Sequence, residues 1–526
     1  MIALIPENPF HLVRESGDGP APAQLHFKGD FQMPMTGLVG IDMRCVESTS
    51  RLCEFHDTHV WSLWFQGAIL ALEDSWIFQN GESRASALAW GAPPRFASDF
   101  PEGKLRDLLE DSSDIRALRK TASARLVREF YEGFDSNGHV VVRLALVRIA
   151  TPRAARIRST LLEIHTVPDC DIQAEELRRH LLAAGCTPAQ ENLIQLVYKM
   201  RGVRPVAYSL KPRLNFPPEA HARSVLLETY NSLLSIARWN ETGIIKDIDT
   251  EFLHDYRVSL RKLRSVISLI KGVFPDALMD SWKKKLGAIC RETNALRDLD
   301  VYILSRSRLS RMLPEELRAG LDGFFKELES ARAIEARRVG AFLGSDSYRS
   351  EVVSLQNAWA SAHTIEETPN ARLPIQQIAG DRILKRFRRI RKIRKSITPE
   401  TPDEVIHSVR IECKKMRYLL ECFGSLFPEE TVAPLARQLA KLQNRLGRYN
   451  DTSVQQDHLL QHAGKHLDSG DTRLALSLGG LIGSLHHEHA SLRENVLNAL
   501  AEFTRGSNAD RAARLAKKPK PPTRLT

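Results

Sequence analysis

The second half of this sequence carries the same short pattern twice, and this repeat limits the folds open to the chain. The segment HDYRVSLRKLR at 254–264 recurs as HSVRIECKKMR at 407–417, an offset of 153 residues. The same offset aligns Phe274-Pro275 with Phe427-Pro428, and Asp298 with Asp451, without a gap. Because histidine, proline and aspartate recur at fixed places, the pattern indicates an old duplication and two similar structural halves.

Each copy of the pattern places its basic residues on one side of an α-helix. At 100° per residue, positions 0, +3, +7 and +10 fall within an arc of about 80°. Like charges at this spacing destabilise a helix. A solvated charged face is the ordinary explanation, but retention of the stripe in two copies favours binding of an anion. The predicted stripes are His254, Arg257, Arg261 and Arg264, and His407, Arg410, Lys414 and Arg417, with Lys262 and Lys415 beside them.

A third basic stripe precedes the second copy. The segment DRILKRFRRIRKIRK at 381–395 repeats the same spacing, and the equivalent positions in the first half are not basic. The binding surface is therefore expected to be asymmetric and heavier on the second half. A general nucleic-acid or targeting patch is the alternative, because basic runs are common. This stripe consists of Arg382, Lys385, Arg389 and Lys392.

Charge and hydrophobic pattern divide the chain in two. The net charge of +11 separates into −5 over residues 1–200 and +16 over residues 201–526. Before residue 200, Asn137-Gly138 is a hairpin turn signal followed by a β-type run at 140–148, and 161–167 is a second strand candidate. A helix is expected over about 174–184, stopped by Gly185. After residue 220 the apolar spacing is helical throughout.

These patterns predict a multidomain protein with four segments. The first, 1–204, is expected to be α+β with antiparallel strands, and 205–218 is a proline-rich linker. The second domain, 219–504, is expected to be all-α, with repeats at about 219–371 and 372–504. Residues 505–526 are expected to form a disordered basic tail.

The sequence also suggests a location. No apolar run is long enough to cross a bilayer. The first residues do not resemble a secretory signal. Seven cysteines in no pattern are typical of reduced thiols. We therefore expect a cytoplasmic protein without a membrane partner.

The repeated motif resembles that of the CHAD family, the conserved-histidine α-helical domain, over about residues 219–503. The segments ALRDLDV at 295–301 and LQNRLGRYND at 442–451 also resemble this family. The resemblance implies two helical bundles related by a pseudo-twofold axis, with basic stripes facing a shared groove. It also implies binding of inorganic polyphosphate, often at polyphosphate granules, by both motif stripes and their two neighbouring lysines.

The first domain resembles, more weakly, the CYTH family, whose fold is an antiparallel β-barrel that forms a triphosphate tunnel. The resemblance rests on 54–59, on 64–72 and on Thr187-Pro188. Such enzymes need an E-x-E-x-K strand whose glutamates hold a divalent metal. Here the best candidate strand reads Gln24-Leu-His26-Phe-Lys28, and Glu163 alone remains on a later strand. We therefore expect an inactive domain with a scaffold or protein-contact role.

Three functions follow as hypotheses. Non-catalytic polyphosphate binding, with granule-associated proteins as possible further partners, leads. A metal-dependent triphosphatase or polyphosphatase of the CYTH class and a nonspecific nucleic-acid binder are the alternatives. Histidines at 458, 462 and 466 and at 486, 487 and 489 have spacings that can bind a transition metal, but such residues are more often exposed polar positions. We expect no catalytic residue, metal or cofactor.

Overall fold

The computed structural model describes residues 23–32, 40–81, 83–89, 91–152, 156–210, 216–365, 368–398, 400–466 and 471–516. It separates into two compact units, Met1–Tyr208 and Ser209–Thr526. The boundary lies inside the predicted linker. Part of that linker, 211–215, lies outside the described residues.

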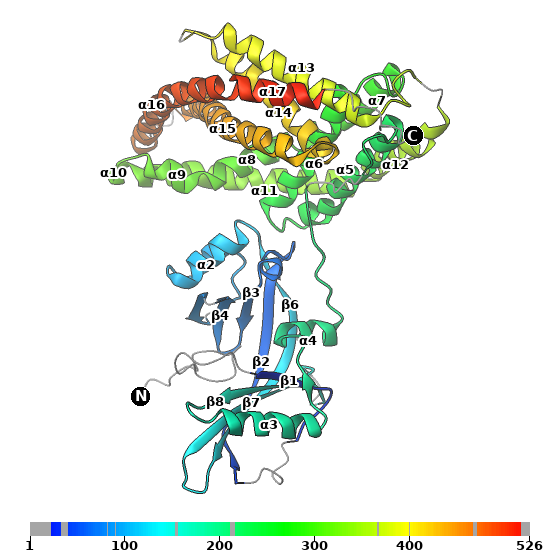
Figure 1. Cartoon of the computed structure of the whole chain (residues 1–526). Helices are drawn as coiled ribbons and strands as arrows, with labels where there is room; N and C mark the ends of the chain where they lie inside the picture. Colours follow the sequence, from blue (N-terminus) through cyan, green and yellow to red (C-terminus); the bar gives the residue numbers. More distant parts are fainter. Residues whose placement is uncertain are drawn as a thin grey trace, which may run out of the picture. The chain divides into compact units, whose positions relative to one another are not determined.

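The first unit is built on an antiparallel sheet whose order is β5-β4-β3-β2-β6-β7-β8-β1-β9 (Figure 1). The α+β prediction is therefore confirmed. These pairings run from β5 at one end to β9 at the other, and closure into a tunnel stays a prediction. The strands are β1 Ala23–Phe27, β2 Asp42–Thr58, β3 Ala68–Leu72, β4 Ser75–Asn80, β5 Ser83–Leu88, β6 Leu118–Phe134, β7 Val140–Ala150, β8 Ile157–Thr166 and β9 Thr187–Pro188.

Local sequence signals account for much of this sheet. The predicted hairpin joins β6 to β7, and Gly138 has a φ of +82° in its turn, a conformation that favours glycine. The two predicted strands correspond to β7 and β8. The predicted helix is α3 (Asp171–Ala183), and Gly185 follows it with a φ of +93°.

Helices cover both faces of the sheet around β7, because its side chains alternate between two cores. Leu144 and Leu146 pack with Leu177 of α3, whereas Val147 packs with Val197 of α4 (Leu193–Arg201). A third core lies between β3–β5 and α2 (Lys104–Ser113), near the short helices α1 (Ser62–Phe65) and η1 (Ala97–Asp99). The sheet is thus buried on both sides along most of β7 and the middle of β8.

The second unit is helical, as predicted (Figure 1). Its first half contains α5 Ala222–Ile245, α6 Thr250–Leu269, α7 Asp276–Glu292, α8 Asn294–Leu304, α9 Arg306–Arg311, α10 Glu315–Arg318, η2 Ala319–Leu321, α11 Asp322–Gly344, α12 Asp346–Ala360 and η3 Ser361–Thr364. Its second half contains α13 Ile375–Lys395, α14 Asp403–Phe423, η4 Gly424–Leu426, α15 Glu429–His466, α16 Thr472–Phe503 and α17 Gly506–Leu515.

The helix boundaries repeat at the offset found in the motif. The helices α5, α6 and α7 begin at residues 222, 250 and 276, and α13, α14 and α15 begin at 375, 403 and 429, so each pair is 153 residues apart. The Tyr302 hydroxyl donates to the Gln455 carbonyl oxygen at 2.8 Å, and these two residues are also 153 apart. This hydrogen bond joins positions of the two halves that are equivalent at the offset of the repeat.

The halves differ where α7 meets α8. The first half breaks its helix at Thr293, whereas the second half continues through the equivalent position as the single helix α15. Each motif helix is anchored by an apolar face in one common core, which includes Leu260 and Leu263 of α6 and Val409 and Met416 of α14. The break therefore changes the surroundings of equivalent motif residues without changing their helices.

The expected tail from residue 505 differs in the structure. Residues 506–515 form α17, and Ala512 and Leu515 bury their side chains in the helical core. Small apolar residues at helical spacing explain this packing, which the basic composition of the segment obscured. The rest of the predicted tail, 517–526, lies outside the described residues. Among the described residues, none of the helices combines the length and apolar character that crossing a membrane requires.

Candidate anion-binding cleft

A cleft of about 330 Å³ lies between the two motif helices of the second unit. Helix α6 forms one wall, α14 the other, and α15 contributes polar residues between them. Both halves of the duplication therefore contribute to one surface. The lining residues are Leu210, His254, Val258, Arg261, Lys262, Arg410, Lys414, Arg417, Tyr418, Glu421, Gln443, Asn444 and Gly447.

The cleft holds an excess of positive charge. Arg261 and Lys414 occupy equivalent positions of the two motifs and both line it. Burial, and then the nearby guanidinium groups of Arg410 and Arg261, lower the pKa of Lys414 to about 8. Burial also lowers the pKa of Arg410, despite the opposing effect of Asp451. Groups whose charged forms are disfavoured in this way gain from an anion placed among them.

Few carboxylates neutralise these groups. Asp451 forms an ion pair of 3.8 Å with Arg410. In the described part of the chain, Arg261 and Lys414 form no ion pair with a carboxylate. Among the described residues, the Nε of Arg410 is buried without a hydrogen-bond partner. Because unpaired buried donors are costly, an anion that accepted from this atom would relieve that cost.

Several predicted residues have other contacts. Arg257 donates to the Cys290 carbonyl oxygen at 3.0 Å and to the Thr293 hydroxyl at 2.6 Å, so it closes the carboxyl end of α7. Arg264 lies against α7 beside Gly287 and Cys290. Neither residue lines the cleft, whereas their equivalents Arg410 and Arg417 do. Their predicted role in binding stays untested.

The two motif lysines are tied to carboxylates. Lys262 is almost fully buried, donates to the Leu210 carbonyl oxygen at 3.1 Å and forms an ion pair of 2.9 Å with Glu421. Lys415 forms an ion pair of 2.9 Å with Glu412. Lys262 still lines the cleft, but Lys415 lies on another face of α14.

The two motif histidines line different pockets. His254 lines the cleft, whereas His407 lines a neighbouring pocket of about 300 Å³ together with Tyr449. The Nδ1 of His407 is 2.6 Å from the side-chain oxygen of Asn450. Arg410 lines both pockets, so the second motif reaches from one into the other.

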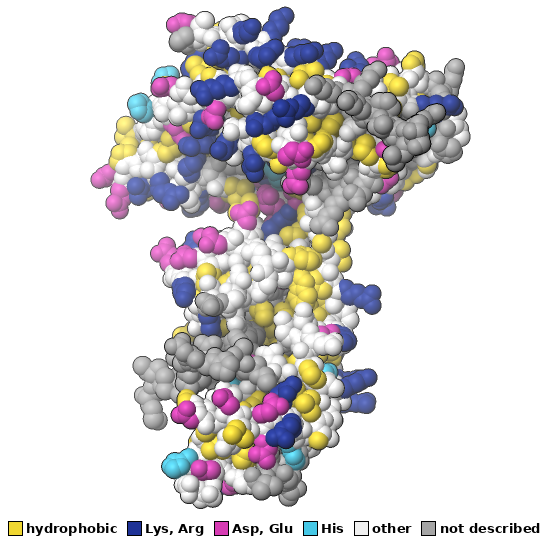
Figure 2. Space-filling view, in the orientation of Figure 1, with side chains coloured by type: hydrophobic (Ala, Val, Ile, Leu, Met, Phe, Trp, Pro, Cys, Tyr) yellow, Lys and Arg dark blue, Asp and Glu magenta, His cyan; other side chains and the backbone are white. Residues whose placement is uncertain are grey.

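The third stripe does not reach the cleft. Helix α13 buries Ile383, Phe387 and Ile390 against the core and contacts the face of α14 that carries Glu412. Arg389 lies 3.7 Å from that carboxylate. Figure 2 shows Lys and Arg side chains along the upper edge of the helical unit, where α13 lies in Figure 1. The predicted stripe Arg382, Lys385, Arg389 and Lys392 is thus a separate basic surface, and its ligand role stays a prediction.

Sequence reasoning missed the polar residues that complete the cleft. Gln443 and Asn444 fall in the segment 442–451, whose family resemblance does not single out these two side chains. Tyr418 and Glu421 continue the second stripe by one more turn. Extending the helical spacing beyond Arg417 would have found both residues.

One group of metal-ligating side chains occurs among the described residues. Glu251, His254 and Asp255 place a ligand atom each within 4.8 Å of one another at the start of α6. Arg297 lies 4.0 Å from Glu251. Burial lowers the pKa of Arg297, and the carboxylates of Glu251, Asp300 and Asp255 oppose this shift. A guanidinium in this position already supplies the counter-charge that a cation would supply.

The later histidines pack against aromatic rings. His458 lies 4.4 Å from the Tyr302 ring centre, His462 lies 4.6 Å from that of Phe324, and His489 stacks on Tyr449. These contacts favour a structural role over a metal site.

In the first unit, β1 contains Gln24 and His26 of the candidate for the E-x-E-x-K strand, and Gln24 pairs with Glu163 of the neighbouring strand β8. The Gln24 amide donates to the Glu163 carboxylate at 3.0 Å, and that carboxylate is fully buried. His26 contacts the Ser159 hydroxyl at 2.6 Å. A site for Mg²⁺ or Ca²⁺ generally presents several carboxylate or carbonyl oxygens, so this strand pair is a poor fit to one.

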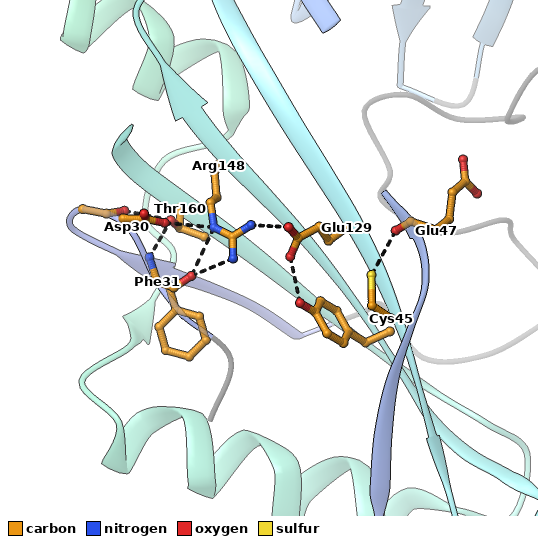
Figure 3. Close-up of polar contacts among 9 residues, drawn as sticks. Asp30, Phe31, Cys45, Glu47, Glu129, Arg148 and Thr160 are labelled. Carbon is orange, nitrogen blue, oxygen red and sulfur yellow. Dashed lines mark hydrogen bonds and ion pairs between the residues drawn. The ribbon is translucent and has the colours of Figure 1, made fainter. Parts of the chain in front are cut away.

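Basic side chains of the sheet are neutralised by neighbouring strands. Arg148 donates to Glu129 at 2.5 Å, contacts the Phe31 carbonyl oxygen and lies 2.9 Å from Asp30 (Figure 3). Arg128 donates to the buried Glu73 at 3.0 Å. These arginines therefore offer less free positive charge to a triphosphate than the cleft of the second unit.

The second unit contains the residues that match a known protein family. Residues 231–460 match the family model of the CHAD domain. The crystal structure of the CHAD domain from the plant Ricinus communis is 22% identical, with a TM-score of 0.46, covering 55% of this chain and 94% of that chain. PptA from Streptomyces chartreusis is 15% identical, with a TM-score of 0.41, covering 53% of this chain and 99% of that chain. No curated protein matches the sequence. The CYTH resemblance of the first unit stays a prediction.

Proposed function

On the premise that its helical unit carries a CHAD domain, we propose that this chain binds inorganic polyphosphate in the cleft between α6 and α14. The main observation in support is that cations from both motif helices lie in the same cleft. Arg261, Arg410, Lys414 and Arg417 all line this cleft. The proposed activity is binding without catalysis.

The chemistry of the cleft suits a chain of phosphates. Polyphosphate presents closely spaced negative charges and no bases, so guanidinium forks and ammonium groups suffice to hold it. A phosphate beside Lys414 would favour its protonated form and raise its lowered pKa. Displaced counterions would add to the affinity, which should therefore fall as salt rises.

The test is competition binding with matched charge reversals. Labelled long-chain polyphosphate is displaced by DNA, RNA or unlabelled chain at fixed ionic strength. The variant Arg410→Glu/Lys414→Glu should lose roughly a hundredfold in affinity. The control Lys326→Glu/Arg337→Glu carries the same charge change on α11, where both residues are exposed, and should lose much less.

A third variant addresses the separate basic surface of α13. Lys385→Glu/Lys392→Glu changes two exposed residues of this helix. A loss comparable to that of the cleft variant would assign polyphosphate to α13 as well. If all three double variants bind alike, or if DNA and RNA displace the label as well as polyphosphate does, the proposed function is wrong.

We propose a scaffold or protein-contact role for the first unit, and granule association for the whole chain. The supporting observation is the replacement of strand carboxylates by Gln24 and His26 in β1. Phosphate release from tripolyphosphate with Mg²⁺ or Mn²⁺ would contradict the first proposal. For the second, a fluorescent fusion should follow the granules, and Arg410→Glu/Lys414→Glu should disperse it.

A further inference from the structure

A single carboxylate stands among the cations of the cleft. In the described part of the chain, Glu421 is the one acidic residue of its lining. It lies one helical turn beyond Arg417 on α14. Its presence is unexpected, because a carboxylate repels the phosphate that the cleft is proposed to bind.

Glu421 holds two cations of the cleft. Its carboxylate accepts from the Nε of Arg417 at 2.6 Å and lies 2.9 Å from the Nζ of Lys262. Burial raises the pKa of Glu421, but the two cations together have the larger effect and lower the pKa below its usual range. The carboxylate is therefore ionised at neutral pH and neutralises this end of the cleft.

The cleft is thus divided along its length. At one end, Arg261 and Lys414 have no ion pair with a carboxylate among the described residues, and Arg410 has only the 3.8 Å contact with Asp451, which does not line the cleft. At the other end, Glu421 holds Arg417 at 2.6 Å and Lys262 at 2.9 Å. Arg417 and Glu421 also line an adjoining groove of about 630 Å³ on α14 and α15. Glu421 and Arg417 thus lie at the boundary between the cleft and this groove.

This carboxylate belongs to the second half alone. The position equivalent to Glu421 is Ser268, whose hydroxyl donates to the Arg264 carbonyl oxygen at 2.8 Å within its own helix. Arg264 packs on α7 rather than against a carboxylate of its own stripe. The division of the cleft is therefore not a by-product of the duplicated fold.

We propose that Glu421 is a specificity-determining residue that a bound anion must displace to reach Arg417 and Lys262. This inference rests on the proposed polyphosphate binding. A short anion contacts Arg261, Arg410 and Lys414 and leaves Glu421 in place. A longer chain has further phosphates that can replace the carboxylate on Arg417, at the cost of separating it from two cations. Glu421 thereby reduces the advantage of long chains over short ones.

The test compares two ligand lengths in Glu421→Gln, using tripolyphosphate and a long-chain polyphosphate. Freeing two cations should raise long-chain affinity roughly fivefold or more and steepen its log–log salt dependence by about 1.4, whereas tripolyphosphate affinity should change less than about twofold. Glu412→Gln is the matched control, because it is a buried glutamate of the same helix that pairs with Lys415 and Arg386 on another face.

A second pair of variants guards against misfolding, since Glu421→Gln leaves Lys262 without its carboxylate. Lys262→Met alone keeps Glu421 on Arg417 and should not favour long chains. Glu421→Gln/Lys262→Met removes both members of the buried pair and should still free Arg417, so its long-chain affinity should exceed that of Lys262→Met. Thermal melts of each variant show whether the fold is retained.

Different results separate this inference from the proposed function. If wild type binds and Arg410→Glu/Lys414→Glu does not, but Glu421→Gln keeps the wild-type length dependence, the role of Glu421 is refuted and the binding site stands. Equal gains for both ligands, or equal gains in Glu412→Gln, would show a general charge effect and also refute it. If neither ligand binds the wild type, the proposed function itself fails.

Discussion

Replacing Lys414 by methionine should stabilise the unliganded protein while weakening its binding. The pKa of this lysine is about 8 instead of the ordinary 10.5, because of burial and then Arg410 and Arg261. At pH 7 the folded protein therefore carries a cation that its surroundings disfavour. Methionine keeps the apolar stem of the side chain and removes this charge.

The magnitude follows from the change in pKa. A difference from 10.5 to about 8 corresponds to about 3 kcal/mol if the whole charge were buried. Screening by solvent around a half-buried side chain reduces this to about 1–2 kcal/mol. For a helical unit of this size, the expected rise in Tm is roughly 2–5 °C.

The pH dependence of the stability gain shows whether the buried lysine charge causes it. A lysine whose folded-state pKa is lowered costs stability fully below that value, and the cost disappears as pH rises through the unfolded pKa. The cost should therefore be complete at pH 7, decline between about 8 and 10.5, and fall to about a quarter at pH 10. The difference in Tm between Lys414→Met and wild type should shrink in the same window.

Calorimetry of the full chain without ligand, at pH 7 and pH 10, measures this difference. Lys385→Met is the control, because this lysine is exposed on α13 and should leave Tm nearly unchanged. A lower Tm for Lys414→Met at pH 7, or a gain that is the same at both pH values, would refute the reasoning that the cleft is strained by its own charge.

Three further outcomes can be checked with similar variants. Polyphosphate affinity should fall between pH 7 and pH 9, because Lys414 loses its proton in this range. Titration calorimetry in buffers of different ionisation enthalpy should show proton uptake on binding near pH 8. An affinity independent of pH would contradict the role assigned to Lys414. Arg257→Ala should cost about 1–3 kcal/mol of stability in chemical denaturation, because it leaves the carbonyl oxygen at the end of α7 without its donor. Arg410→Ala should mainly weaken polyphosphate binding. The reverse pattern would contradict this division of roles between the two arginines. Arg148→Ala should destabilise the first unit by about 3 kcal/mol, because it leaves Glu129 without its cation. The melting transition of that unit measures this loss, and polyphosphate binding should remain.

The spacing of the motif predicted much of the candidate site. It placed His254 and Arg261 on one helix and Arg410, Lys414 and Arg417 on another, because helical periodicity fixes which residues share a face. The offset of the repeat likewise agrees with the starting residues of three pairs of helices. Periodicity could not tell that the two faces meet, since this depends on packing between distant segments.

Other features depended on contacts that no local pattern records. The break at Thr293 turns Arg257 toward the end of α7, and nothing in the spacing distinguishes it from Arg410. The pairing of Lys415 with Glu412 is a neighbour effect on one helix that could have been found, because the two lie three residues apart. The helix at 506–515 was missed because composition outweighed its apolar spacing.

The break between α7 and α8 has a consequence for how this chain tolerates mutation. Arg257 and Arg410 occupy equivalent positions of the two motifs, and the guanidinium of Arg257 forms part of a helix terminus. Loss of Arg257 is expected to reduce stability, whereas loss of Arg410 is expected to matter only when ligand is present. A mutation that impairs folding and a mutation that impairs recognition are therefore expected at separate codons, and each position can change without the other.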